Sequence, residues 1–277
     1  MTTLTPETFT HDGLCFRTFA GGAGDAIVFL HGGGSRAGHF LGVMERLAPD
    51  FRVIAFDMRG FGETGAHPAR AITHQTWADD ALACLNHFGL ETCTVVGWSL
   101  GAAIALNLAS QHQARVSAMA LLGAPHPARR IDPAVFERRL RIIADGGTSA
   151  DVVAATFEAT AQAVSPWVRT HRPEAVERIR QEHLSQDVTL AARLVDSYAS
   201  RPDLTAVLPK VLCPVTLIVG QDDPIAPLAA AEELKRRLVH ATVRTVANCG
   251  HYYAVEQPDT VVGLIAEAAK SRGTHGR

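Results

Sequence analysis

The feature that most constrains this 277-residue chain is the segment Gly-Trp-Ser-Leu-Gly at residues 97–101. It directly follows an apolar run at residues 92–96 and directly precedes an alanine-rich run at residues 102–109. This order predicts a strand, a tight turn that carries Ser99, and a helix whose amino-terminal end lies behind the serine. Because the flanking glycines have no Cβ atoms to clash with neighbouring strands, the segment predicts that Ser99 is presented as a nucleophile.

A candidate acid and a candidate base follow on two later turns. One apolar run precedes Gly-Gln-Asp-Asp at residues 220–223, and a second strand-like run precedes Asn-Cys-Gly-His at residues 248–251. Ligands of open α/β sheets bind beyond the carboxyl ends of the strands, so we expect Ser99, one of the two aspartates and His251 to converge there. The chain order serine, acid, histidine matches one hydrolase architecture and neither the chymotrypsin nor the subtilisin order.

Three further motifs lie at strand-like ends. His-Gly-Gly-Gly-Ser occupies residues 31–35, the segment at residues 56–64 is Phe-Asp-Met-Arg-Gly-Phe-Gly-Glu-Thr, and Gly-His at residues 250–251 is followed by Glu-Gln-Pro at residues 256–258. With the serine turn, these motifs make the chain resemble the α/β-hydrolase fold family over nearly its whole length. The resemblance implies an α/β fold, with a mostly parallel central sheet flanked by helices and an inserted all-helical lid.

The arrangement of runs along the chain predicts where that insertion lies. Strand-like and helical runs alternate up to about residue 124, as βαβ units require. Between residues 126 and 208 the apolar residues follow helical spacing, and no strand-like run interrupts them. We therefore predict a core of residues 1–125 and 209–277 and a helical insertion of residues 126–208. The resemblance identifies the insertion as a lid over the strand ends, which would enclose an apolar pocket.

The resemblance gives each residue of the proposed triad a role. Ser99 is the nucleophile, and His251 is the base that takes its proton and later returns it to the leaving group. An aspartate holds the imidazole in the right tautomer and stabilises its charged form. Both Asp222 and Asp223 are available, and the family's spacing between the strand-end glycine and the next proline favours Asp223.

Other residues are expected to complete the site. The family places the two oxyanion-hole amides at Gly33 and Leu100, while His31 is expected to orient the glycine loop by hydrogen bonding. Asp57 and Arg59 are expected to brace neighbouring loops. The candidates that line the pocket are Gly32, Trp98, Trp167, Tyr198 and Tyr252. For Trp98, Trp167 and Tyr198, packing in the protein interior is the alternative role. A solvated helix face is expected for the arginines at 129, 130, 138, 139 and 141.

These observations predict a serine hydrolase that cleaves a carboxylic ester or lactone of a small molecule through an acyl-enzyme, with no metal or organic cofactor. A serine at position 99 argues against dehalogenases and epoxide hydrolases of this fold, which use aspartate there. One alternative is hydrolysis of a carbon–carbon bond in ring-cleavage products, although such enzymes usually carry tryptophan where this chain has Tyr252. The others are a cofactor-free perhydrolase and a receptor-like binder of a small ligand that keeps the triad.

The overall charge and composition limit the kinds of partner and compartment that we expect for this protein. A formal charge of −2 gives no support for a nucleic-acid partner, and histidine and cysteine show no metal-ligand spacing. The amino-terminal segment lacks the features of a signal peptide, and no run approaches the ~18 apolar residues of a membrane span. Five widely spaced cysteines favour free thiols in a reducing compartment. We therefore expect a cytoplasmic protein without membrane partners, and the sequence leaves its oligomeric state open.

Overall fold

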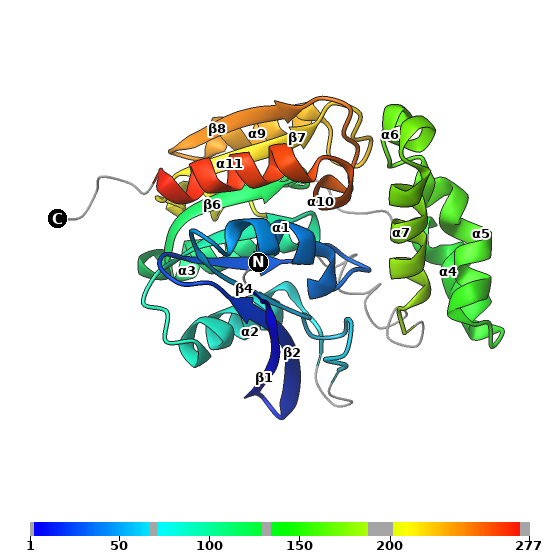
Figure 1. The fold of residues 1–277 in the computed structure, drawn as a ribbon, viewed down its shortest axis with the longest axis horizontal. Helices are drawn as coiled ribbons and strands as arrows, with labels where there is room; N and C mark the ends of the chain where they lie inside the picture. The colour runs from blue at the N-terminus through cyan, green and yellow to red at the C-terminus, as the bar shows by residue number, and fades with distance from the viewer. Residues whose placement is uncertain (1–2, 67–70, 129–133, 188–201, 272–277) are drawn as a thin grey trace.

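A central eight-stranded sheet organises the computed structural model, which describes residues 3–66, 71–128, 134–187 and 202–271. The strands in chain order are β1 (Thr5–His11), β2 (Leu14–Gly21), β3 (Ala26–Leu30), β4 (Arg52–Phe56), β5 (Cys93–Trp98), β6 (Val116–Leu122), β7 (Val215–Gly220) and β8 (Ala241–Val246). In space they follow the order β1-β2-β4-β3-β5-β6-β7-β8. Only β1–β2 and β2–β4 pair antiparallel. The predicted mostly parallel sheet is confirmed (Figure 1).

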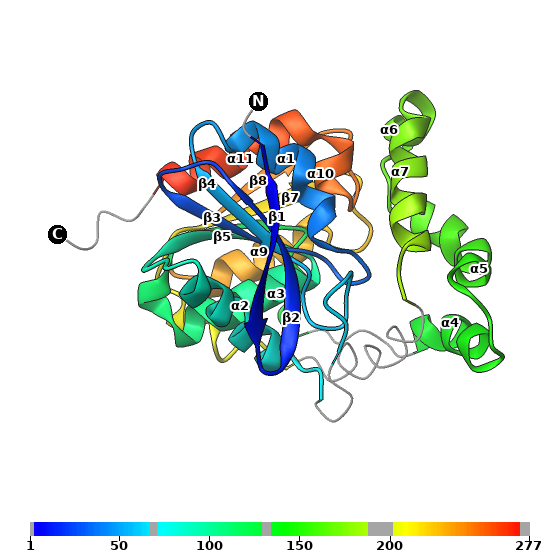
Figure 2. The same ribbon diagram turned by 60° about the horizontal axis from the view of Figure 1, so that its bottom comes forward.

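Helices cover both faces of this sheet. The core helices are η1 (Ala37–Phe40), α1 (Leu41–Leu47), α2 (His74–His87), α3 (Leu100–Gln111), η2 (Gln113–Arg115), η3 (Leu208–Lys210), α9 (Leu228–Arg237), α10 (Tyr253–Glu256) and α11 (Pro258–Lys270). Figure 2 shows α1 and α11 on one face and α2, α3 and α9 on the other. Every residue of β3 and β5 is buried, because helices cover both faces of these central strands.

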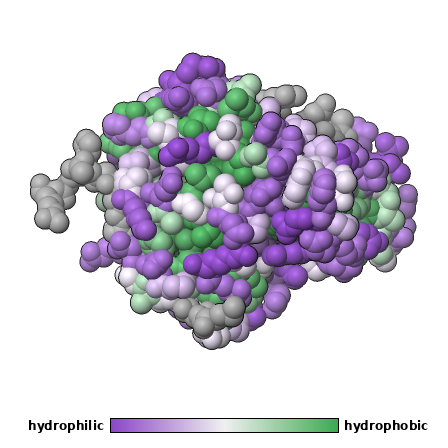
Figure 3. Space-filling view, turned by 45° about the horizontal axis from the view of Figure 1, so that its top comes forward, coloured by the Kyte–Doolittle hydropathy of each residue, from purple (hydrophilic) through white to green (hydrophobic). Residues whose placement is uncertain are grey.

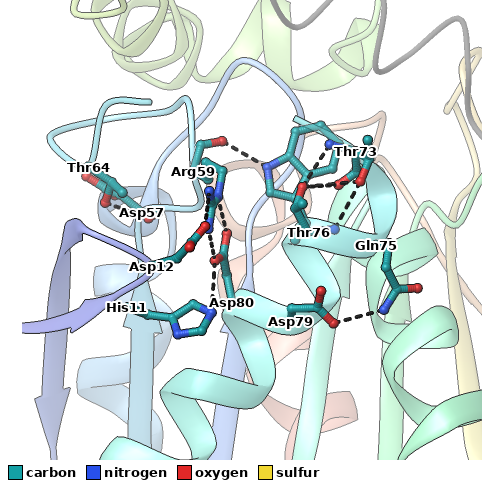
Figure 4. Close-up of polar contacts among 11 residues, drawn as sticks. His11, Asp12, Asp57, Arg59, Thr64, Thr73, Gln75, Thr76, Asp79 and Asp80 are labelled. Atoms are coloured by element: carbon teal, nitrogen blue, oxygen red, sulfur yellow. Dashed lines mark hydrogen bonds and ion pairs between the residues drawn. The ribbon is translucent and has the colours of Figure 1, made fainter. Parts of the chain in front are cut away.

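A buried ion network braces the turn after β4. The Arg59 guanidinium donates to both carboxylate oxygens of Asp80 on α2, at 2.9 and 2.6 Å, and to Asp12 in the turn between β1 and β2 at 2.9 Å (Figure 4). The indole of Trp77 donates to the Arg59 carbonyl at 2.8 Å. Asp57 accepts hydrogen bonds from backbone amides on two loops. The bracing role expected for Asp57 and Arg59 is confirmed.

Between β6 and β7 the chain forms a separate group of helices, which we call the insertion. Its described helices are α4 (Ala134–Ala144), α5 (Ser149–Ala161), α6 (Pro166–His171) and α7 (Pro173–Leu184). They lie together at one end of the molecule in both ribbon views (Figures 1 and 2). The face of the insertion seen on the right of Figure 3 is mostly hydrophilic. The division at residues 126 and 208 stays a prediction.

The insertion contacts the loops beyond the carboxyl ends of the strands. The backbone amide of His251, after β8, donates to the carbonyl of Ala163 at 2.7 Å. His183 on α7 meets the hydroxyl of Tyr252. The described helices of the insertion therefore adjoin the sheet edge at which the sequence places the site. None of the helices in the described ranges combines the length and apolar character that a membrane crossing requires.

Candidate active site

Ser99 lies on a strained turn between β5 and α3. Its φ of +51° is in the left-handed region that side chains rarely adopt. A Cβ atom on Gly97 would lie 2.6 Å from the carbonyl oxygen of Gly101, and one on Gly101 would lie 2.1 Å from that of Leu30. Only glycine fits at either position, which explains the two glycines. Ser99 as a whole residue is partly exposed at the sheet edge.

His251 and Asp223 meet at the same edge. Nδ1 of His251 lies 2.8 Å from Oδ2 of Asp223, which also accepts a hydrogen bond from the hydroxyl of Tyr253 at 2.7 Å. The other oxygen of Asp223 accepts from the amides of Ile225 and Ala226. Burial opposes ionisation of Asp223, but the charge and hydrogen bond of His251, with the other donors, lower its pKa. Asp223 is therefore an ionised partner for the imidazole.

Asp222 occupies a different environment. Asp222 is exposed. Its carboxylate accepts a hydrogen bond from Ser165 Oγ at 2.7 Å, and its backbone amide donates to the carbonyl of Cys249. Within the described ranges Asp222 makes no hydrogen bond or ion pair with His251. Of the two aspartates, the structure thus brings Asp223 to the histidine.

A side-chain hydrogen bond links the serine turn to the loop of His251. The indole nitrogen of Trp98, next to Ser99, donates to the carbonyl of His251 at 2.7 Å. A Cβ on Gly123, just past β6, would lie 3.1 Å from both Asp223 Oδ2 and His251 Cε1. Among the described residues, no hydrogen bond joins Ser99 Oγ to the His251 ring. Catalytic hydrogen bonds of this kind often tighten only when substrate binds.

The loop after β3 carries the candidate oxyanion glycine. Nδ1 of His31 lies 2.8 Å from the carbonyl of Gly32, and its Nε2 accepts from the amide of Met58 at 3.0 Å. Burial lowers the pKa of His31, so we assign a neutral ring with its proton on Nδ1. His31 holds the loop by hydrogen bonding, as expected. Gly33, two residues after His31, is exposed at the sheet edge.

The second candidate amide lies on the neighbouring strand end. Leu100 is the first residue of α3, so its N–H belongs to the first turn, whose amides have no partner within the helix. Because β3 and β5 are parallel neighbours, the loops that carry Gly33 and Leu100 leave the sheet at the same edge. Gly32 packs against the Trp98 ring, since a Cβ there would lie 2.9 Å from it.

The candidate pocket residues have different locations. Trp98 is buried, and its ring centroid lies 5.7 Å from that of His251 and 5.5 Å from that of Tyr252. Trp167 on α6 is 41% exposed and stacks on His171 of the same helix. In the described part of the chain it has no ring contact with Trp98 or Tyr252. The candidate at position 198 lies outside the described residues.

Several residues at the site were not identified from the sequence. Tyr253 is one, because no local pattern reports that its hydroxyl reaches Asp223. Glu256 belongs to a recognised motif, but its role comes from the structure. Its carboxylate accepts hydrogen bonds from the amides of Ser165, Gly250 and Tyr252, each at 2.8 Å. Glu256 thereby fixes the loop that carries His251.

The arginines of α4 only partly match the expectation. Arg138 is exposed and the Arg141 side chain is 76% exposed, as expected for a solvated face. Arg139 is instead half-buried and lines a small cavity with Phe157, His183 and other residues of α5 and α7. The expectation is therefore wrong for Arg139, because α4 turns this position toward α5. The arginines at 129 and 130 lie outside the described residues.

No group of three or more His, Cys, Asp or Glu side chains in the described ranges is arranged to hold a metal ion.

Comparison with known proteins places the chain in a family. The model of the alpha/beta hydrolase fold matches residues 25–258. The AB hydrolase superfamily protein YisY of Bacillus subtilis is 30% identical, with 90% of this chain and 93% of that protein covered. The putative carbamate hydrolase RutD of Escherichia coli O157:H7 is 26% identical, with 88% and 91% covered.

Solved structures agree with this match. A thermophilic esterase from Thermogutta terrifontis, solved with malate bound, superposes with a TM-score of 0.83 at 28% identity, covering 99% of this chain and 100% of that one. The chain is a hydrolase enzyme and belongs to the alpha/beta hydrolase fold family.

Proposed function

We propose that this enzyme is a serine hydrolase that cleaves carboxylic esters or lactones of small molecules, with Ser99, His251 and Asp223 as its triad. The observation that carries the proposal is the buried 2.8 Å contact between His251 and Asp223, at the edge where the strained turn presents Ser99. A neutral serine hydroxyl is a weak nucleophile, so this histidine is the base that it needs.

The proposed reaction follows from the hydrogen bonds of the ring. If Nδ1–H donates to Asp223, then Nε2 is left to take the proton from Ser99 Oγ as that oxygen bonds to the substrate carbonyl carbon. Asp223 stabilises the resulting imidazolium. The carbon–oxygen bond to the alcohol breaks as His251 gives that proton to the departing oxygen. Water, deprotonated by His251, then attacks the acyl-enzyme, and the proton returns to Ser99.

The proposed oxyanion hole consists of the N–H groups of Gly33 and Leu100. The carbonyl oxygen becomes negative as Ser99 attacks, and amides that are already oriented stabilise that charge. The exposure of Gly33 and the position of Leu100 at the start of α3 support these assignments. The Gly33 amide lies on the loop after β3 and the Leu100 amide lies in the first turn of α3, both at the carboxyl edge of the sheet.

We further propose that the insertion acts as the lid of this site and that Gly32, Trp98 and Tyr252 form pocket walls beneath it. The contact between His183 of α7 and the Tyr252 hydroxyl, at 3.1 Å, supports a roof at this place. The exposed indole of Trp167 argues against a wall role for that residue in this arrangement.

A carbamate is the second substrate class that an observation favours. RutD, which matches over most of its length, is named a putative carbamate hydrolase, and the Thermogutta protein is named an esterase. Esters, lactones and carbamates all present a carbonyl carbon with an oxygen leaving group, so the same serine attack would serve each of them.

The test is a panel of p-nitrophenyl acyl esters of increasing chain length, simple lactones and a p-nitrophenyl carbamate. We expect turnover of at least one ester or lactone by the wild type, an initial burst of p-nitrophenol, and near-complete loss in Ser99→Ala. Equal activity of Ser99→Ala and wild type would contradict the assignment of the nucleophile. A protein that cleaves nothing in the panel, but is stabilised thermally by one of these compounds, would instead be a binder.

A further inference from the structure

Glu182 on α7 is a buried carboxylate that reaches from the insertion to the core. Oε1 accepts a hydrogen bond from Ser35 Oγ, and Oε2 lies 2.9 Å from Nδ1 of His39. The side chains of Glu182 and His39 are only 12% and 1% exposed. Burial opposes the charge of Glu182. The charge and hydrogen bond of His39 and the hydrogen bond from Ser35 outweigh this effect and lower the pKa of Glu182 to about 2. The carboxylate is therefore ionised at neutral pH.

The first partner, Ser35, lies at the end of the glycine loop. The core holds the start of that loop through His31, whereas its end is contacted by Glu182 of α7. Gln186, which follows α7, also lies near this end: its side-chain oxygen is 3.3 Å from the position that a Cβ on Gly34 would take. Within the described ranges, Ser35 Oγ has no other hydrogen-bond partner. Gly33, the candidate oxyanion donor, lies between these two supports.

The second partner, His39, leads to the other half of the site. Its ring stacks on that of Trp98, with centroids 4.1 Å apart and planes inclined by 12°. The indole nitrogen of Trp98 in turn donates to the carbonyl of His251. One oxygen of Glu182 thus contacts the loop of the oxyanion glycine. The other is joined through two stacked rings to the loop of the proposed base.

Anchoring of α7 alone does not account for this arrangement. A buried carboxylate bonded to an imidazole is weak evidence for stability, because withdrawing the charge of Glu182 from water offsets much of what its hydrogen bonds contribute. The insertion also has other attachments to the core, including the bond from Arg172 to the carbonyl of Glu256 at 2.9 Å and the contact between His183 and Tyr252. Neither of these contacts includes an atom of Glu182.

We infer that Glu182 is a positioning residue, which holds the Gly33 amide in the orientation needed for the transition state only while α7 rests on the core. This inference depends on the proposed function. Its consequence is that closure of the insertion and completion of the oxyanion hole are one event. A substrate that keeps α7 in place would be turned over, whereas one that displaces α7 would bind without efficient reaction.

The test compares Glu182→Ala, Glu182→Gln and the control Glu177→Ala. Glu177 lies on the same helix but is exposed and pairs with Arg180. The readouts are kcat and KM for p-nitrophenyl butyrate and the inhibition constant of butylboronic acid, which forms a tetrahedral adduct with a nucleophilic serine.

For Glu182→Ala we expect kcat to fall about 10- to 100-fold, with KM within about threefold of wild type. The boronate constant should weaken by the same factor as kcat, because both depend on the oxyanion hole. Glu182→Gln should recover most of the loss, since its amide oxygen still accepts from Ser35. Glu177→Ala should match wild type. Ser35→Ala removes one contact and should show a smaller effect of the same kind, which keeps the test decisive if Glu182→Ala does not fold.

Two results would overturn the inference alone. One is a Glu182→Ala enzyme with wild-type kcat and raised KM, which would show that Glu182 only shapes the pocket. The other is unchanged boronate binding in both Glu182→Ala and Ser35→Ala. A wild-type protein that neither turns over the ester nor binds the boronate would overturn the proposed function together with this inference.

Discussion

Nδ1 of His251 lies 2.8 Å from Oδ2 of Asp223, and only 5% and 4% of these two residues are exposed. The residues come from loops after different strands, β8 and β7, which run parallel and end at the same edge. Water is largely excluded from the contact, so the carboxylate orients the ring more strongly than it would at the surface. The orientation of the His251 ring therefore depends on Asp223.

Exchange of each aspartate for asparagine distinguishes the two candidates for the acid. Asp223→Asn should lower kcat by about 1,000-fold or more, because the amide favours the wrong imidazole tautomer. Asp222→Asn should stay within about threefold of wild type, because Asp222 is exposed and contacts Ser165. Steady-state kinetics of both variants with one ester substrate measures the two effects on kcat. The reverse order of effects would assign the acid to Asp222.

Tyr253→Phe tests whether the Tyr253 hydroxyl supports Asp223, the proposed acid of the triad. The hydroxyl donates to Asp223 at 2.7 Å and accepts from the amide of Gly220 at 3.0 Å, so its loss leaves that buried amide unpaired. We expect the free energy of unfolding to fall by about 1–3 kcal/mol and kcat to fall about threefold to tenfold. Urea denaturation and ester kinetics measure the two effects. A variant as stable and active as wild type would show that this hydroxyl is dispensable.

Glu256→Ala tests what fixes the loop of His251. Three buried amides would lose their acceptor, so we expect about 3–5 kcal/mol of destabilisation. Glu267→Ala, on the exposed side of α11, is the matched control and should change stability by less than about 0.5 kcal/mol. Chemical denaturation of both variants provides the comparison. Equal stabilities would mean that Glu256 does not organise the loop.

The pH dependence of stability tests the environment of His183. Burial lowers the pKa of His183 from 6.5 to about 4. Between these values the unfolded chain binds a proton at this residue and the folded chain does not, so stability falls as pH decreases from about 6.5 to 4. The full difference corresponds to about 3 kcal/mol. His183→Gln keeps a polar partner for Tyr252 without titrating, and urea denaturation from pH 7 to 4.5 should show a shallower decline. Parallel curves for the two proteins would contradict the prediction.

Local sequence patterns predicted the fold and the residues on the strand ends. The turn at Ser99 was identifiable from a glycine-flanked serine between a strand-like and a helix-like run. The structure supplies the reason for the glycines, since a Cβ on Gly97 or Gly101 would clash with Ala102 or Leu30. The central strands were identifiable from continuous apolar runs, which parallel strands buried on both faces require. The family's motif spacing also favours Asp223, which is the aspartate that the structure places against His251.

Contacts between distant segments could not be predicted in this way. Glu182 and Ser35 are 147 positions apart, and they meet only because α7 rests on the glycine loop. The same reason explains Tyr253 and Arg139, whose partners depend on packing between elements. For Trp167 the obstacle is the short helix α6, in which Val168 is buried and Trp167 beside it is exposed. Six residues show too little periodicity to indicate which side faces the core.

The most direct measurement is the mass of the intact protein, with the modified peptide mapped, after reaction with a fluorophosphonate. We predict one label per chain, on the peptide that contains Ser99, with labelling abolished in Ser99→Ala and slowed by at least about 100-fold in His251→Ala. Labelling at another residue, or undiminished labelling of Ser99→Ala, would contradict the assignment of Ser99 as the nucleophile.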